Sequence, residues 1–298
     1  MTPHLLDITD ITADDLRTIL VLAQRPDLPQ VLAGRGAALI FEKPSNRTRH
    51  SMEMAVVQLG GHPVYTRGEE VGFDVREPVE DIVKVMAGYH ALLAARVFTH
   101  DIVVRMAAVS PVPVVNMLSD HSHPLQALAD MLTMQQVHGS VDGLRVAYVG
   151  DYNNVSRSLG EACVMLGATL ALACPVGYHA DDAELERVNA QGPGAVTQVH
   201  RPADAVVGAV AVHTDSWTSM GQEAEKQQRS QAFEGYTVDL ALMAHAAPGA
   251  GFYHCLPAYR GLEVSADVID GPASHVFAQA HNRMHAARGA LAFLLGVR

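Results

Sequence analysis

The sequence predicts an α/β protein of two domains, each a mainly parallel sheet flanked by helices. Three observations support this prediction. Short apolar runs alternate with longer helical patterns along the chain, a small polar stretch interrupts the pattern near the middle, and 298 residues are enough for two ordinary domains. Apolar residues make up 49% of the chain and charged residues 18%, which is typical of a globular protein with a large core.

The apolar runs have the length and composition of buried strands, and each is followed by polar loop residues. Before the middle of the chain they cover residues 36–41, 91–98 and 112–116, and after it residues 144–150, 168–173, 195–199, 208–213 and 251–254. Helical patterns cover residues 45–59, 124–138, 154–166 and 279–295. The polar stretch 139–143 marks a boundary. We therefore predict one domain from residues 1–138 with 279–298, and a second from residues 139–278.

The charge balance limits the kinds of partner. The chain has 32 acidic and 21 basic side chains, a net charge of −11, which argues against binding to nucleic acid or to an anionic membrane. The three cysteines lie beside apolar residues, as reduced thiols do, and no apolar run approaches the ~18 residues of a membrane helix. We expect a cytoplasmic protein that binds small molecules.

The segment 41–50 is the first candidate site, because it joins a buried strand directly to a helix. Ser45 is suited to cap that helix, so the following amides would point outward with the positive end of the helix dipole behind them. Thr48 adds a hydroxyl group, and Arg47 and Arg49 add positive charge. The pattern indicates a phosphate site, although an ordinary capped helix with two solvated arginines would look the same.

Further polar residues follow other predicted strands or begin helices. Arg96 ends a strand and would face either a ligand or a structural salt bridge, while His123 precedes a helix that carries Gln126 one turn later. A histidine at this place is more often a helix cap or a surface residue than a catalyst. Cys255 also follows a strand, where a thiol could be a nucleophile or an inert buried group.

Two other patterns concern the second domain. Asp215 and Trp217 lie in a loop that either closes over a ligand or is anchored by the packing of the indole ring. Residues 150–154 lack the glycines of a dinucleotide-binding turn, which disfavours an oxidoreductase. His281 and His285 are one turn apart, but no third metal ligand accompanies them in the sequence, so we predict no metal site.

Taken together, these motifs resemble those of the aspartate and ornithine carbamoyltransferase family. The matching segments are Ser-Asn-Arg-Thr-Arg at 45–49, His-Pro-Leu-Gln at 123–126, Asp-Ser-Trp-Thr-Ser-Met-Gly at 215–221, His-Cys-Leu-Pro at 254–257, and Arg283 in the last helix. The resemblance covers nearly the whole chain. Asn46 departs from the threonine that the family usually has there.

The resemblance implies a role for each matching residue. Arg96, His123 and Cys255 are expected to be catalytic. Carbamoyl phosphate is expected to contact Ser45, Asn46, Arg47, Thr48, Arg96, His123, Gln126, Cys255, Leu256 and Arg283, and ornithine to contact Asn154, Asp215, Ser219 and Met220. No cofactor or metal is implied.

The resemblance further implies transfer of a carbamoyl group from carbamoyl phosphate to the side-chain amine of ornithine, giving citrulline and phosphate. It also implies a homotrimer, or a multiple of trimers, in which a loop near Glu70 reaches a neighbouring subunit. The alternatives are a carbamoyltransferase for another diamine or diamino acid and a catalytically silent relative.

Overall fold

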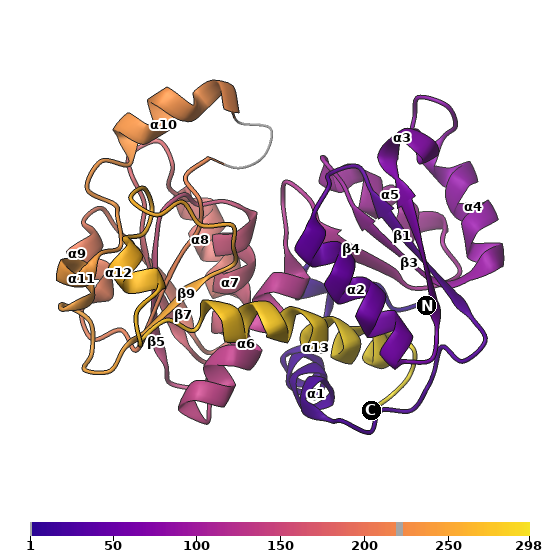
Figure 1. Cartoon of the computed structure of the whole chain (residues 1–298), viewed down its shortest axis with the longest axis horizontal. Helices are drawn as coiled ribbons and strands as arrows, with labels where there is room; N and C mark the ends of the chain where they lie inside the picture. Colours follow the sequence, from indigo (N-terminus) through magenta and orange to yellow (C-terminus); the bar gives the residue numbers. More distant parts are fainter. Residues whose placement is uncertain (1, 219–222) are drawn as a thin grey trace. The chain divides into compact units, whose positions relative to one another are not determined.

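The computed structural model describes residues 2–218 and 223–298. The chain forms two compact units: unit 1 comprises Met1–Leu132 and His281–Arg298, and unit 2 comprises Thr133–Ala280. Each unit contains a parallel sheet with helices packed on it (Figure 1), so the predicted α/β class with two domains is confirmed. The chain passes between the units inside helices α6 (Pro124–His138) and α13 (Val276–Leu294).

Unit 1 contains a four-stranded sheet of order β2-β1-β3-β4, and every pair of neighbours is parallel. Its strands are β1 (Gly36–Phe41), β2 (His62–Arg67), β3 (His90–Arg96) and β4 (Val114–Leu118). Besides parts of α6 and α13, its helices are η1 (Ile8–Asp10), α1 (Ala13–Gln24), α2 (Asn46–Gln58), α3 (Gly68–Val71), α4 (Val79–Tyr89) and α5 (His100–Val109).

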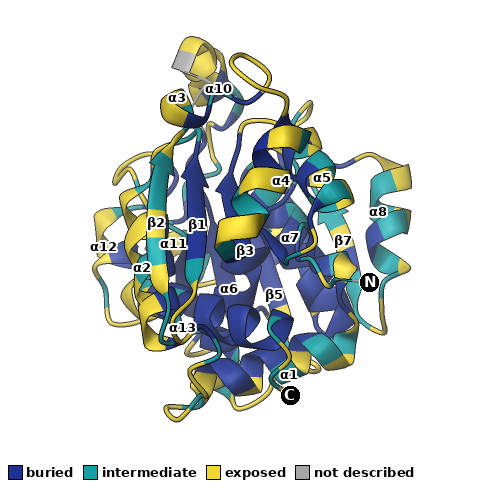
Figure 2. Cartoon of the chain, turned by 90° about the vertical axis from the view of Figure 1, so that its right-hand side faces the viewer, coloured by how far each residue is buried: buried dark blue, intermediate teal, exposed yellow. Residues whose placement is uncertain are grey.

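The strands inside this sheet are apolar because helices cover both of its faces. Ala38 and Ile40 of β1 join a buried cluster with residues of α4 and α5, such as Val83 and Met106, while the alternate residues of β1 are equally buried. Figure 2 shows β3 and most of β1 in the colour of buried residues, whereas β2 at the edge is partly exposed. Residues 60–90, where β2, α3 and α4 lie, were not predicted to form any element. The edge strand β2 in particular lacks the continuous apolar run by which the other strands are recognised.

Unit 2 contains a five-stranded parallel sheet of order β7-β6-β5-β8-β9. Its strands are β5 (Arg145–Val149), β6 (Thr169–Ala173), β7 (Ala195–Val199), β8 (Ala211–Thr214) and β9 (Gly251–His254). Its further helices are α7 (Asn154–Met165), α8 (Asp182–Asn189), α9 (Pro202–Val206), η2 (Glu223–Glu225), α10 (Lys226–Ala232), α11 (Leu240–Met243) and α12 (Ala266–Ile269).

Parallel strands bring their carboxyl ends to the same edge of a sheet, where ligands usually bind. In unit 1, Phe41 at the end of β1 pairs in register with Arg96 at the end of β3. In unit 2, Thr214 at the end of β8 pairs with His254 at the end of β9. Within each unit, therefore, predicted site residues such as Arg96 and Cys255 lie at or just after the ends of neighbouring strands. None of the helices in the described part of the chain is both long and apolar enough to cross a membrane.

Candidate active site

The loop after β1 presents the first turn of α2 at the carboxyl end of the sheet. Ser45 caps the helix: its hydroxyl oxygen accepts a hydrogen bond from the Thr48 amide at 3.3 Å and lies 3.1 Å from the Thr48 hydroxyl oxygen. The next two residues, Asn46 and Arg47, are exposed, whereas Thr48 is buried. A capped and exposed helix start with an adjacent guanidinium suits a bound phosphate.

Arg49, which the sequence analysis counted among the charges of this loop, is directed elsewhere. Its Nε donates to Glu53 Oε1 at 2.8 Å, and its guanidinium lies 3.8 Å above the centre of the Tyr65 ring. The expectation that Arg49 adds charge to the phosphate loop is therefore wrong. In a helix, residues four positions apart share a face, and this spacing pairs Arg49 with Glu53.

Arg96 is buried at the end of β3, directly beside the loop after β1. Its Nη1 donates to the Thr48 hydroxyl oxygen at 3.4 Å, and its carbonyl oxygen accepts from the amides of Glu42 at 2.9 Å and Lys43 at 3.4 Å. The backbone contacts fix the loop after β1 to the end of β3. The side chain brings a permanent positive charge to the same place as the start of α2.

A second group of buried polar side chains in unit 1 surrounds His123, at the start of α6. Arg283 Nη1 lies 3.2 Å from His123 Nε2 and also donates to Gln126 Oε1, while Gln126 Nε2 donates to Asp130 Oδ1 at 2.7 Å. A guanidinium only donates, so Nε2 of His123 accepts and the ring proton resides on Nδ1. Burial lowers the pKa of His123 well below its usual value, and the charges of Arg283 and Arg96 lower it further.

Unit 2 places a carboxylate and a thiol together at the ends of neighbouring strands. The Cys255 thiol donates to Asp215 Oδ1 at 3.1 Å, and the same oxygen accepts from the Ser216 amide at 2.8 Å. Asp215 Oδ2 accepts from Asn153 Nδ2 at 3.1 Å. Asp215 is 7% exposed, whereas Cys255 is half-buried. The carboxylate is thus held in a fixed orientation, as recognition of a cationic group requires.

The same strand ends offer a potential group of metal ligands that the sequence analysis did not foresee. One ligand atom each of Asp215, His254 and Cys255 lies within 4.8 Å of the other two. Both ring nitrogens of His254 already make contacts, Nδ1 with the Leu256 amide at 2.9 Å and Nε2 with Glu263 Oε1 at 3.2 Å. A metal ion would have to replace one of these hydrogen bonds, which disfavours its binding.

Comparison with known proteins agrees with this geometry. A family model described as the carbamoyl-phosphate-binding domain of aspartate/ornithine carbamoyltransferase matches residues 3–136, and one described as the aspartate/ornithine-binding domain of the same enzymes matches residues 142–294. The chain belongs to the aspartate/ornithine carbamoyltransferase family.

Individual relatives in this carbamoyltransferase family cover the whole chain. An ornithine carbamoyltransferase of Thermus thermophilus is 45% identical over 295 residues, which is 98% of this chain and 96% of the relative. The solved structure of ornithine carbamoyltransferase from Pyrococcus furiosus matches with a TM-score of 0.94 and 40% identity, and the match covers 100% of this chain and 98% of the other. A more distant structure, of N-acetyl-L-ornithine transcarbamylase, has a TM-score of 0.88 and 29% identity, with 98% and 99% covered.

Asn154, the residue that the carbamoyltransferase motifs suggest for ornithine, begins helix α7. Its neighbour Asn153, which the sequence analysis did not name, caps that helix by accepting from the amides of Val155 at 2.9 Å and Ser156 at 3.2 Å. Asn153 also contacts Asp215, so the helix start and the carboxylate are connected. The asparagine pair directly before a helical pattern is a recognisable cap signal, but it does not reveal the contact with Asp215.

The loop after Asp215 is held by an arginine that sequence reasoning missed. Arg229 Nη1 donates to Asp151 Oδ2 at 2.7 Å and to the Trp217 carbonyl oxygen at 3.1 Å, and the Arg229 side chain is 7% exposed. Trp217 stacks on Phe233 with ring centres 5.6 Å apart, as expected of a packing anchor. Burial raises the pKa of Asp151, and the hydrogen bond and charge of Arg229 oppose that rise.

Three further expectations concern loops. Ser219 and Met220, suggested as ornithine contacts, lie outside the described residues. Glu70, expected near the site of a neighbouring subunit, accepts hydrogen bonds from Arg67 of its own chain, at 3.1 Å from both the Arg67 amide and its Nη2. This contact occupies Glu70 within helix α3, and it lowers the pKa of the carboxyl group.

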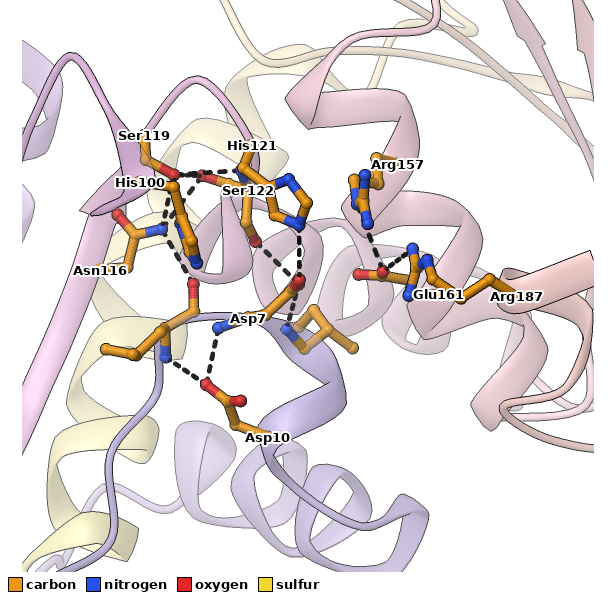
Figure 3. A network of polar contacts seen from close by, with 12 residues as sticks. Asp7, Asp10, His100, Asn116, Ser119, His121, Ser122, Arg157, Glu161 and Arg187 are labelled. Carbon is orange, nitrogen blue, oxygen red and sulfur yellow. Dashed lines mark hydrogen bonds and ion pairs between the residues drawn. The ribbon is translucent and has the colours of Figure 1, made fainter. Parts of the chain in front are cut away.

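The segment before His123 is held by a buried polar network that no motif indicated (Figure 3). Asp7 Oδ1 accepts from the Ser122 hydroxyl at 2.9 Å, and Asn116 Nδ2 donates to the Leu6 carbonyl oxygen at 2.9 Å and lies 3.3 Å from the Ser122 carbonyl oxygen. Both Asn116 and Ser122 are fully buried. The chain near its amino terminus therefore fixes the residue that directly precedes His123.

Proposed function

We propose that the chain transfers the carbamoyl group of carbamoyl phosphate to the side-chain amine of L-ornithine, giving L-citrulline and phosphate. The observation that carries the acceptor assignment is the fixed carboxylate of Asp215 beside the half-buried thiol of Cys255. A carboxylate suits a cationic diamino acid, whereas an aspartate acceptor would require basic groups. The names of the relatives, ornithine carbamoyltransferases of Thermus thermophilus and Pyrococcus furiosus, support the same acceptor.

In this proposal the phosphate group binds at the start of α2, to the hydroxyl groups of Ser45 and Thr48, the amide of Asn46 and the guanidinium of Arg47. The capped helix start and its dipole favour the anion there. Arg96 contacts both the phosphate and the carbonyl oxygen of the carbamoyl group, because it donates to Thr48 from the end of the next strand.

The carbamoyl group itself is assigned to the cluster around His123. A neutral imidazole with its proton on Nδ1 can donate to the carbonyl oxygen, and the lowered pKa of His123 keeps the ring neutral. Arg283 fixes the position of this ring and completes the carbamoyl pocket. The side-chain oxygen of Gln126 and the carbonyl oxygen of Leu256 are assigned to accept from the carbamoyl nitrogen.

The chemistry requires donors at the carbonyl oxygen and an uncharged amine. The amine nitrogen of ornithine attacks the carbonyl carbon, and negative charge accumulates on the carbonyl oxygen. The bond to phosphate then breaks with its electron pair leaving on phosphate, and the departing phosphate takes up the proton that the attacking amine loses. Each preorganised donor, such as Arg96 or His123, contributes about 3 to 4 kcal/mol to the transition state. Asp215, Asn154, Ser219 and Met220 are proposed to hold the amino acid.

The test is a citrulline assay with carbamoyl phosphate and, in parallel, ornithine, putrescine, lysine, N-acetylornithine and aspartate. Saturable turnover with ornithine alone is the expected result. Turnover only with another amine would support carbamoyl transfer but reject ornithine as the acceptor. No turnover with any of the amines would identify a catalytically silent relative. The rate with ornithine should rise from about pH 6 to about pH 9 as the amine loses its proton, and a flat profile would contradict attack by the neutral amine.

We further propose a cytoplasmic homotrimer or a multiple of trimers. Several large apolar side chains of unit 1 are exposed, which favours contact with other subunits: Val75 (88%), Tyr89 (73%), Phe98 (51%) and Val85 (49%). Light scattering coupled to size exclusion measures the mass directly. A measured mass of 31.9 kDa, which is that of a single chain, would reject the trimer.

A further inference from the structure

A buried histidine and glutamate lie directly behind the turn that carries Cys255. His254 ends strand β9, and both His254 and Glu263 are fully buried. Glu263 Oε1 lies 3.2 Å from His254 Nε2 and accepts from the Tyr259 amide at 2.6 Å. On the other side of the ring, His254 Nδ1 accepts from the Leu256 amide at 2.9 Å. The His254–Glu263 pair therefore binds two backbone amides of the turn at residues 255–259, those of Leu256 and Tyr259.

The contacts permit only one tautomer of the ring. The Leu256 amide can only donate, so Nδ1 of His254 must carry a lone pair there. The proton of the neutral ring is consequently on Nε2, from which it donates to Glu263 Oε1. The carboxylate thus determines which nitrogen of His254 faces the Leu256 amide, as a hydrogen-bond partner commonly does for a functional histidine.

The turn needs such support because Leu256 adopts a left-handed backbone conformation. Its φ is 58°, in the region that favours glycine, so a residue with a side chain is strained there. Cys255 lies between His254 and Leu256 in the chain, and its thiol reaches Asp215 Oδ1 at 3.1 Å. The hydrogen bond from Leu256 to the ring holds the backbone on one side of Cys255, and strand β9 holds it on the other.

We propose that Glu263, acting through His254, is a positioning residue that sets the Cys255–Leu256 backbone against Asp215 and so aligns the acceptor amine for attack. This inference rests on the proposed function, since it presumes that Asp215 and Cys255 contact the acceptor. A displacement of a reacting group by about 1 Å lowers the rate of a well-aligned reaction by about 100-fold. Loss of the carboxylate should therefore affect turnover more than it affects folding.

Three variants of the full-length protein separate these effects. Glu263→Ala removes the carboxylate that accepts hydrogen bonds from His254 and the Tyr259 amide, and we expect kcat to fall by about 10- to 100-fold. Glu263→Gln keeps an oxygen that can accept from both His254 and the Tyr259 amide, so kcat should stay within about threefold of the parent protein. Val264→Ala is the matched control: Val264 is fully buried in the same segment, and its loss should lower stability without lowering kcat.

The result that would overturn the proposal is a Glu263→Ala protein that is destabilised like Val264→Ala but keeps its kcat. Equal losses in Glu263→Gln and Glu263→Ala would also overturn it, because the charge and not the geometry would then matter. A ¹⁵N NMR spectrum of the imidazole gives a readout that does not depend on activity, and a proton on Nδ1 of His254 would contradict the tautomer. If the parent protein makes no citrulline from ornithine, ornithine is rejected as the acceptor while the role of Glu263 remains under test. The variants are then assayed with the amine that the parent protein does carbamoylate.

Discussion

Replacing Asp215 by asparagine tests the acceptor site most directly. The substitution removes the charge while keeping the shape of the side chain. Oδ1 of Asp215 accepts from the Ser216 amide and from the Cys255 thiol, so the oxygen of the introduced amide would occupy that position. Its NH₂ group would then face Asn153 Nδ2, which now donates to Asp215 Oδ2 at 3.1 Å. Two donors would meet.

The side-chain amide of Asn153 cannot flip to relieve this conflict. Asn153 Oδ1 accepts from the amides of Val155 and Ser156 and thereby caps helix α7. Asp215→Asn should therefore lower the free energy of unfolding by about 1 to 3 kcal/mol, the cost of leaving a buried polar group without a partner. A hydrogen bond to a charged group contributes about 1.5 to 3 kcal/mol, so kcat/KM for ornithine should fall by about 10- to 150-fold.

A double variant separates the two losses. Adding Asn153→Asp to Asp215→Asn supplies a carboxylate that can cap α7 with one oxygen and accept from the introduced amide with the other. The hydrogen bond between positions 153 and 215 is restored and the net charge of the chain is kept, but the charge no longer lies beside Cys255. We expect stability to recover and kcat/KM for ornithine to remain low.

The assays are equilibrium unfolding in urea and steady-state citrulline formation at saturating carbamoyl phosphate. A change of kcat/KM converts directly into lost transition-state stabilisation. An Asp215→Asn protein that kept kcat/KM for ornithine within about threefold of the parent value would contradict the role assigned to this charge. Full activity of the double variant would contradict the same role, because the position of the charge would then be unimportant.

Three further outcomes are expected. Arg229→Ala removes the guanidinium that pairs with the carboxylate of Asp151. The free energy of unfolding should fall by about 3 to 5 kcal/mol and KM for ornithine should rise, and an unchanged urea midpoint would contradict this. Gly289→Ala should destabilise by about 1 to 3 kcal/mol, because a Cβ there would lie 2.7 Å from the Ala23 amide nitrogen, and a midpoint equal to that of the parent would show that the helices separate easily. Burial lowers the pKa of His123, so below about pH 6.5 the unfolded chain binds a proton at this residue that the folded chain does not bind. His123 should therefore leave stability unchanged above that pH and lower the free energy of unfolding by at most about 1.4 kcal/mol per pH unit below it. The measurement is the urea midpoint from pH 7.5 to pH 5, and a midpoint that rises on acidification would contradict this sign.

The class of fold and most of the proposed site follow from the amino-acid sequence alone. Short continuous apolar runs bounded by polar loops are typical of strands in sheets covered on both faces, so their alternation with helical patterns indicated parallel sheets. Polar residues at the ends of such runs or just after them, such as Arg96, Asp215 and Cys255, could be placed at the carboxyl edges without coordinates. The helix cap at Ser45 was also readable, because a cap depends only on neighbouring residues.

Which polar groups meet across long stretches of chain becomes known only from the folded structure. The contacts of Asp7 with Ser122, of Arg283 with His123, and of Arg229 with Asp151 join residues that are 115, 160 and 78 positions apart. Such pairs leave no periodic pattern, since their geometry is set by strand order and not by local spacing.

Local chemistry also leaves the direction of a side chain open. Arg49 carries the same charge as Arg47, yet its position on α2 turns it toward Glu53. His254 and Glu263 are single polar residues in apolar surroundings, which a sequence cannot distinguish from ordinary buried groups. Their shared hydrogen bond appears only when strand β9 and the turn after it are folded together, because burial in a low-dielectric core requires each polar group to find a partner there.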